Sequence, residues 1–116
     1  MRVASLRWTF TPQHVRETPD LQGVFTLWDA NECVYIGHTP WNRTLRDSLR
    51  QHLELLAEGV FQASHFTWET TATPKSRAAE LLSVFGQKLG GLPRYNRADS
   101  PLLPPPASVT DLRARS

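Results

Sequence analysis

The sequence predicts an α+β domain, in which a small three-stranded antiparallel sheet is flanked by helices. Residues 24–28 are apolar at nearly every position, and residues 33–36 form a second β-prone run after a turn at 29–32. Strands joined by so short a turn must be antiparallel. Two later segments carry apolar residues at helical spacing, which places helices against this sheet.

Length and composition favour a single packed domain. The chain has 116 residues, of which 40% are hydrophobic, enough for a core without metal or disulfide support. The formal charge of +2 permits nucleic-acid binding without requiring it. Cys33 is the single cysteine, so no intrachain disulfide can form, which suits a reducing compartment. No apolar run has the length of a signal peptide or membrane helix, so we expect a cytoplasmic protein without membrane contact.

The N-terminal part, residues 1–22, is predicted to be an extended segment followed by a short helix that packs on the main domain. Residues 3–10 have mixed strand character. Thr11 and Pro12 suit the N-cap and first position of a helix, and Pro19 stops that helix. The main domain is expected to cover residues 23–97.

Two amphipathic segments predict the longer helices, and an aromatic segment between them predicts the third strand. The first helix, at about 42–57, repeats leucine on one stripe: Leu45, Leu49, Leu53 and Leu56. Residues 65–71 are aromatic and β-branched, which is typical of a strand. Thr73 and Pro74 begin the second helix, which Gly90 ends. Its apolar stripe is Ala78, Leu81, Leu82, Phe85 and Leu89.

The composition changes after Asn96. Residues 98–116 contain four prolines between positions 101 and 106 and end in a polar stretch. We expect a flexible tail or a peptide docked on the surface. A proline-rich segment can also engage a partner chain.

Five short elements occur in a meaningful order: Gly23-Val24-Phe25, Tyr35-Ile36-Gly37, Arg46, Glu80 and Pro93-Arg94-Tyr95-Asn96. Together they resemble the GIY-YIG nuclease family over residues 23–96. The resemblance implies a three-stranded antiparallel sheet between helices and metal-dependent hydrolysis of DNA, as in repair or restriction. Phe25 departs from the family pattern, because it lacks the hydroxyl of the first motif tyrosine.

The resemblance also implies a role for three residues. Glu80 would be the protein ligand of a single Mg²⁺ or Mn²⁺ ion, which prefers oxygen donors. Arg46 would bind phosphate, and Tyr35 would act as general base or hold the attacking water. A phenol with a pKa of about 10 needs nearby cations to lower that pKa before it can act as a base. Arg46 and the metal would supply them.

Each role has a simpler alternative. Helical glutamates are commonly solvated, and Glu80 lies away from the apolar stripe of its helix. Arg46 shares a helix face with acidic residues and so suits a salt-bridged surface. Tyr35 suits a strand tyrosine that only packs. Arg43 is a possible substitute for Arg46, because the loop after Gly37 is one residue longer than is usual in the family.

Other residues are candidate contacts around this site. His38 follows the second motif directly and titrates near neutrality, so it suits phosphate contact or proton transfer. Trp41 lies in the next loop and could stack on a base. Asn96 could contact substrate or hold the last segment against the helices. The substrate-binding candidates are Arg43, Arg50, Trp41 and Asn96.

Two functions follow from these observations. The first is a Mg²⁺- or Mn²⁺-dependent DNA endonuclease that grips the phosphate backbone, alone, as a homodimer or with a protein partner. The alternative is a catalytically impaired nucleic-acid-binding module or accessory protein that retains the fold. The missing hydroxyl at Phe25 favours the alternative.

Overall fold

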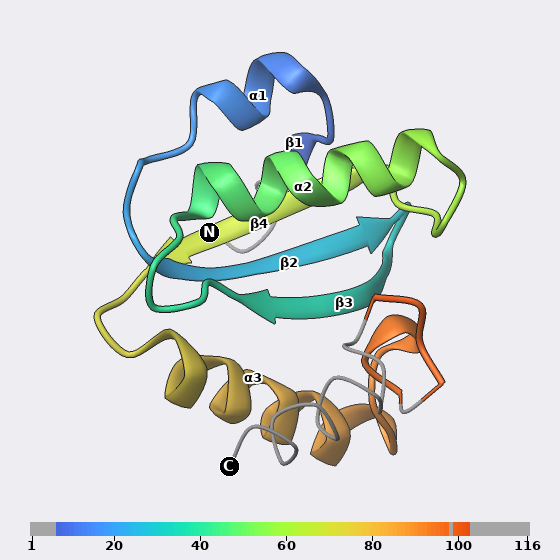
Figure 1. Ribbon diagram of the computed structural model, residues 1–116. Coiled ribbons are helices and arrows are strands. Elements are labelled where there is room, and N and C mark those ends of the chain that lie inside the picture. The colour runs from blue at the N-terminus through green and yellow to red at the C-terminus, as the bar shows by residue number, and fades with distance from the viewer. Residues whose placement is uncertain (1–6, 98, 103–116) are drawn as a thin grey trace, which may run out of the picture.

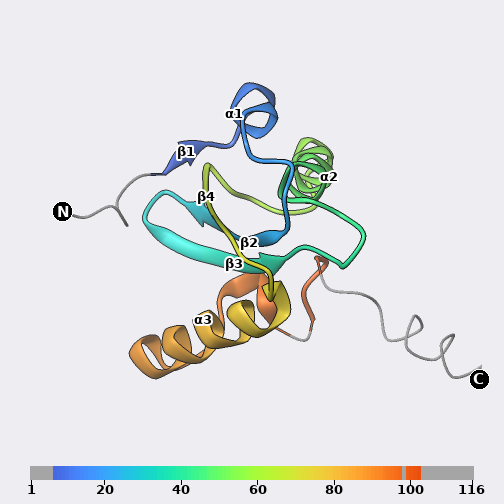
Figure 2. The ribbon, with the colours of Figure 1, turned by 90° about the vertical axis from the view of Figure 1, so that its left-hand side faces the viewer.

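The computed structural model describes residues 7–97 and 99–102, and in it helices cover both faces of one antiparallel sheet. Helix α2 lies on one face and helix α3 on the other (Figure 1). A quarter turn of the molecule shows the same layers end-on (Figure 2). The elements in chain order are β1 (Trp8–Thr9), α1 (Pro12–Arg16), β2 (Gly23–Asp29), β3 (Glu32–His38), α2 (Leu45–Ala57), β4 (His65–Thr70), α3 (Pro74–Leu89) and the 3-10 turn η2 (Arg94–Asn96).

The predicted α+β class is confirmed, with one strand more than expected. The sheet order is β1-β4-β2-β3, and every pair is antiparallel. The additional strand is β1, which pairs with His65 and Phe66 of β4. It joins the sheet because Phe10, just after it, is buried against the Phe66 ring, with 5.4 Å between the ring centroids. The sequence signal for residues 3–10 did not identify that partner.

Helix α2 begins at Leu45, three residues later than predicted. Residues 40–43 form a turn instead, in which the Arg43 amide donates to the Pro40 carbonyl at 3.1 Å. Thr44 then caps the helix by accepting from the Asp47 amide. The other boundaries follow the sequence closely: Thr11 caps α1, and Gly90 ends α3 with φ of +79°.

A bulge in the β2–β3 hairpin sets the direction of Tyr35. The register shifts between Leu27 and Trp28, which pair with Tyr35 and Cys33, so Val34 is the extra residue on β3. Val34 and Tyr35 consequently both pack into the core beneath α2.

The core has two layers, one on each face of the sheet. The larger layer, beneath α2, includes Phe10 and Val15, so the described part of the N-terminal segment belongs to the domain. The smaller layer lies beneath α3 and includes Ala78, Leu82 and Phe85. Leu89, at the last position of α3, does not join its predicted stripe, and its side chain is 69% exposed.

The predicted tail can be judged only at its start. Ala98 and residues 103–116 lie outside the described residues, whereas Leu102 packs against the core beneath α2. No helix within residues 7–97 or 99–102 is both long and apolar enough to cross a membrane.

Candidate functional site

Tyr35 and Phe25 form an aromatic cluster with His52 of α2. The ring centroids of Tyr35 and Phe25 are 6.0 Å apart, and His52 lies 5.5 Å from Tyr35 and 5.2 Å from Phe25. Gly37 leaves room for this cluster. A β-carbon at Gly37 would lie 2.5 Å from Cζ of Phe25 and 2.6 Å from Cε2 of Tyr35. The two sequence motifs therefore meet through packing.

This environment disfavours Tyr35 as a base. Burial raises the pKa of Tyr35, because the phenolate loses its solvation. Burial accounts for this shift, which is opposite in direction to the lowering expected from Arg46 and a metal. The neighbouring His52 is held by the Ser48 carbonyl oxygen, 2.8 Å from its Nδ1.

Arg46 is engaged elsewhere. Its Nε and Nη2 donate to the Thr18 carbonyl oxygen at 3.2 and 2.9 Å. Thr18 follows α1, so Arg46 ties the first turn of α2 to the N-terminal segment. A half-buried guanidinium held in this way serves the fold, and its Nε–Nη2 edge is not free to grip a phosphate while it is bound to Thr18.

Glu80 belongs to an exposed ion-pair cluster. Its Oε1 accepts from Nη1 of Arg77 at 3.2 Å, and Arg77 also binds both carboxylate oxygens of Glu69, at 2.8 and 3.2 Å. These carboxylates raise the pKa of Arg77. The Arg77 guanidinium occupies one oxygen of Glu80 and opposes a divalent cation there, whereas Glu69 balances its charge and the other Glu80 oxygen has no described partner. Within the described ranges no group of three or more His, Cys, Asp or Glu residues could hold a metal.

Three of the four residues predicted to be catalytic, Tyr35, Arg46 and Glu80, are held by separate partners. Arg46 and Glu80 stand on helices that cover opposite faces of the sheet (Figure 1). No described hydrogen bond or ion pair joins any two of Tyr35, Arg46 and Glu80. Each lies on the element expected from the sequence, but the directions of the side chains were not predictable from spacing.

Asn96 holds the last segment in place, one of its two predicted roles. Its Oδ1 accepts from the Ile36 amide at 2.8 Å, and its Nδ2 donates to the Ile36 carbonyl at 2.9 Å. These bonds engage both ends of the side-chain amide, which supports the structural role and leaves one N–H and one oxygen lone pair uncommitted.

Arg43 and Arg50 line a small polar hollow on the outside of α2. Its volume is about 420 Å³, and it is lined by Asn42, Arg43, Asp47, Arg50, Gln51 and Glu54. Arg50 donates to Asp47 at 2.9 Å, the salt-bridged surface that was the alternative interpretation. The hollow holds two arginines and two carboxylates, so its formal charge is balanced; Arg50 is paired with Asp47, whereas Arg43 forms no ion pair with a described residue.

The loop after β3 presents a fully accessible tryptophan on a well-held backbone. Trp41 is 88% exposed. The Gln22 side chain donates to the carbonyl oxygens of Pro40 and Trp41, at 3.1 and 2.5 Å. At the start of the loop, buried Thr39 exchanges two hydrogen bonds with Gly23, of 3.0 and 3.1 Å. Gln22 carried no sequence signal, because its role depends on a contact with a loop far along the chain.

Positive charge gathers at the same end of the sheet. Both α2 and α3 begin there (Figure 1), so the positive ends of their dipoles face one region. The first turn of α3 has no acidic residue, and its N-cap Thr73 makes no side-chain capping bond. Lys75 lies in that turn, close enough to His38 to lower its pKa in addition to the larger effect of burial.

No protein-family model, curated protein or solved structure matches this chain. The likeness to GIY-YIG nucleases therefore stays a resemblance carried by the five sequence elements. The features of this chain that indicate a function are the Trp41 loop and the charges around it.

Proposed function

We propose that this protein is a nucleic-acid-binding module that takes unpaired bases at the Trp41 loop and has no hydrolytic centre of its own. The observation that carries the proposal is the 88% exposure of Trp41 on a loop fixed by Gln22 and Thr39. A large apolar ring in water, held by a rigid backbone, suits stacking on a base. A fixed loop also lowers the entropy lost on binding.

The charges beside Trp41 suit a phosphate backbone. Arg43 is exposed in the turn before α2, and Lys75 is exposed in the first turn of α3. The N-terminus of α3, which has no acidic residue and no side-chain cap, adds backbone amides and partial positive charge at this end. The amides of Leu45 and Asp47 at the start of α2 are already bound, by the Leu21 carbonyl and the Thr44 hydroxyl. Arg77 contributes less, because Glu69 and Glu80 already neutralise it.

The surroundings of the motif residues favour binding over hydrolysis. Phe25 has no hydroxyl, and burial keeps Tyr35 protonated. Arg46 is bound to the Thr18 carbonyl, and Glu80 to Arg77. The metal-dependent endonuclease implied by the resemblance remains a prediction. A DNA-cutting assay distinguishes it from a module that only binds.

The binding test uses the full chain and fluorescence anisotropy of labelled oligothymidine at low ionic strength, with a matched duplex for comparison. We expect the single strand to bind more tightly, because a paired base cannot stack on Trp41. Trp41→Ala should weaken binding about tenfold, the loss of one base stack. Trp8→Ala removes another partly exposed tryptophan from β1 and should leave the affinity unchanged. Equal affinities of Trp41→Ala and the unmodified protein would contradict the proposal.

A second assay addresses hydrolysis. The same protein is incubated with plasmid and branched DNA in Mg²⁺ or Mn²⁺, and we expect no cutting above background. Cutting that disappears in Glu80→Ala would instead establish the endonuclease and place the metal on Glu80.

A further inference from the structure

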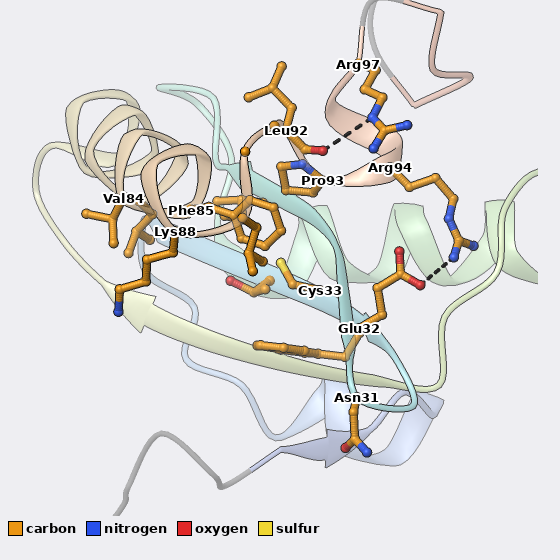
Figure 3. Close-up of a pocket in the computed structure, with 17 residues that line it drawn as sticks. Asn31, Glu32, Cys33, Val84, Phe85, Lys88, Leu92, Pro93, Arg94 and Arg97 are labelled. Atoms are coloured by element: carbon orange, nitrogen blue, oxygen red, sulfur yellow. Dashed lines mark hydrogen bonds and ion pairs between the residues drawn. The ribbon is translucent and has the colours of Figure 1, made fainter.

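A second hollow lies between α3 and the sheet, at the other end of β3 from Trp41 (Figure 3). Its volume is about 730 Å³, within the range of roughly 300–1,000 Å³ that is usual for small-molecule sites. Trp28, Cys33 and Ile36 line it from the sheet, and Leu81 and Phe85 line it from α3. The hollow is independent of the proposed nucleic-acid surface.

Apolar side chains surround the opening without being covered. Val84, Leu89 and Leu92 all line the hollow and are 47%, 69% and 43% exposed. Single exposed apolar residues are common, but three around one hollow mark a binding site. Figure 3 shows Val84 on the helix and Leu92 on the segment beyond it, with Cys33 between Phe85 and Glu32.

The ring of Trp28 is fixed in place. The guanidinium carbon of Arg7 lies 3.8 Å from the centroid of this ring. Arg7 is itself held by the carbonyl of Ala30 at 3.2 Å and by Oδ1 of Asn31 at 3.4 Å. Arg7 does not line the hollow, whereas Trp28 does. The ring therefore presents an aromatic surface to the hollow with a cation stacked on it, a setting that suits an electron-rich ring.

The charges around the opening favour an anion. Three cations line the hollow, Lys88, Arg94 and Arg97, against the single carboxylate of Glu32. Arg94 is neutralised, because it pairs with Glu32 at 2.6 Å and with Asp29 at 3.9 Å, so the surplus of positive charge comes from Lys88 and Arg97. Lys88 lines the hollow and forms no ion pair with any described residue. Figure 3 shows its ammonium group extending outward from α3.

We propose that this hollow binds a small planar aromatic acid. Its ring lies in the apolar space between Trp28 and α3, and its carboxylate pairs with Lys88. The aromatic floor selects the ring, and the surplus of cations selects the anionic group. A neutral aromatic molecule and an aliphatic acid each satisfy only one of these features.

The test follows the indole N–H resonance of Trp28 in the full chain by NMR during titration with 2-naphthoate. The matched probes are 2-naphthylmethanol, which keeps the ring without the charge, and octanoate, which keeps the charge without the ring. We expect 2-naphthoate to bind several-fold more tightly than either. Lys88→Ala should lower the affinity for 2-naphthoate about fivefold, the effect of one exposed charge pair. The affinity for 2-naphthylmethanol should not change.

Two variants on α3 keep this result interpretable. Lys75→Ala removes an exposed lysine from the other end of the helix and should not affect 2-naphthoate. Val84→Asp places a carboxylate at an exposed lining position, where it should repel 2-naphthoate without unfolding the protein. Equal binding of all three probes, an effect of Lys75→Ala as large as that of Lys88→Ala, or no shift of Trp28 at saturating probe would overturn the proposal.

Discussion

The side-chain amide of Asn96 pairs with both main-chain groups of Ile36, through bonds of 2.8 and 2.9 Å. It imitates one rung of a β-ladder on the outer edge of β3 and so fastens η2 to the sheet. Tyr95 adds to this attachment, because its hydroxyl accepts from the Gln62 amide at 3.1 Å and its ring packs against Phe61.

Asn96→Ala is expected to lower the free energy of unfolding by about 1–3 kcal/mol, because two part-buried main-chain groups lose their partners. Asn96→Asp should also destabilise, since a carboxylate cannot donate to the Ile36 carbonyl. Urea denaturation measures both effects. Asn42→Ala, at an exposed position, is the control and should change little. An Asn96→Ala variant as stable as this control would show that η2 is held by other contacts.

Phe25→Tyr restores the motif hydroxyl, and we expect it to destabilise the protein by about 1–3 kcal/mol. Phe25 is 1% exposed and lies against Tyr35, His52 and the backbone of Gly37, so the added oxygen meets a packed core. Thermal unfolding gives the stability, and the plasmid assay should still detect no cutting. A stable Phe25→Tyr protein that cuts DNA would show that the hydroxyl alone was missing.

Stability should fall as the pH drops through the titration range of His52. Burial lowers the pKa of His52 below its ordinary value of 6.5, although the Ser48 carbonyl opposes this. The unfolded chain then binds a proton more readily than the native protein, so the contribution of His52 is complete above pH 6.5 and declines below it.

Urea midpoints at about pH 7.5 and about pH 5.5 bracket this change. His52→Gln should remove most of the difference between the two midpoints. His38→Gln should remove less, because His38 is more exposed although its pKa is also lowered. The reverse order would assign the pH dependence to His38 and Lys75.

Mg²⁺ and EDTA should both leave the melting temperature unchanged, since Arg77 occupies the Glu80 carboxylate. Differential scanning fluorimetry provides the measurement. Arg77→Ala is the informative variant, because it frees Glu69 and Glu80 together. Stabilisation of the unmodified protein by Mg²⁺, abolished by Glu80→Gln, would establish the metal site instead.

The salt dependence of oligothymidine binding should identify the phosphate contacts. Arg43→Ala and Lys75→Ala should each reduce the slope of log affinity against log salt by about one, because one fewer counterion is released on binding. Arg77→Ala should change the slope less, since two carboxylates already neutralise Arg77. Unchanged slopes for Arg43→Ala and Lys75→Ala would place the nucleic acid elsewhere.

Local signals predicted most of the fold. The leucine stripe of α2 packs as expected at Leu45 and Leu49, and Thr11, Pro74 and Gly90 mark helix ends where the structure has them. These features depend on neighbours within a turn or two of the chain. Residues 3–10 showed strand character, but the pairing of β1 with β4 was not predicted, because it depends on Phe66. The start of α2 was placed three residues early, because it depends on the turn at Pro40.

The candidate site was less predictable, because it depends on where long side chains find their partners. The partner of Arg46 is a carbonyl 28 residues away in the chain, and Glu80 is engaged by a neighbouring arginine that also reaches β4. Spacing placed both residues on the correct helices but gave no information on these contacts. Trp41 was identified correctly as a loop residue, whereas the Gln22 amide that fixes its loop carried no signal.

Gly37 ties the Tyr35-Ile36-Gly37 string to the fold itself. Two aromatic rings leave no space for a side chain at this position, whether or not a water molecule is ever activated nearby. Packing alone therefore requires glycine here, so its presence does not by itself indicate an active enzyme.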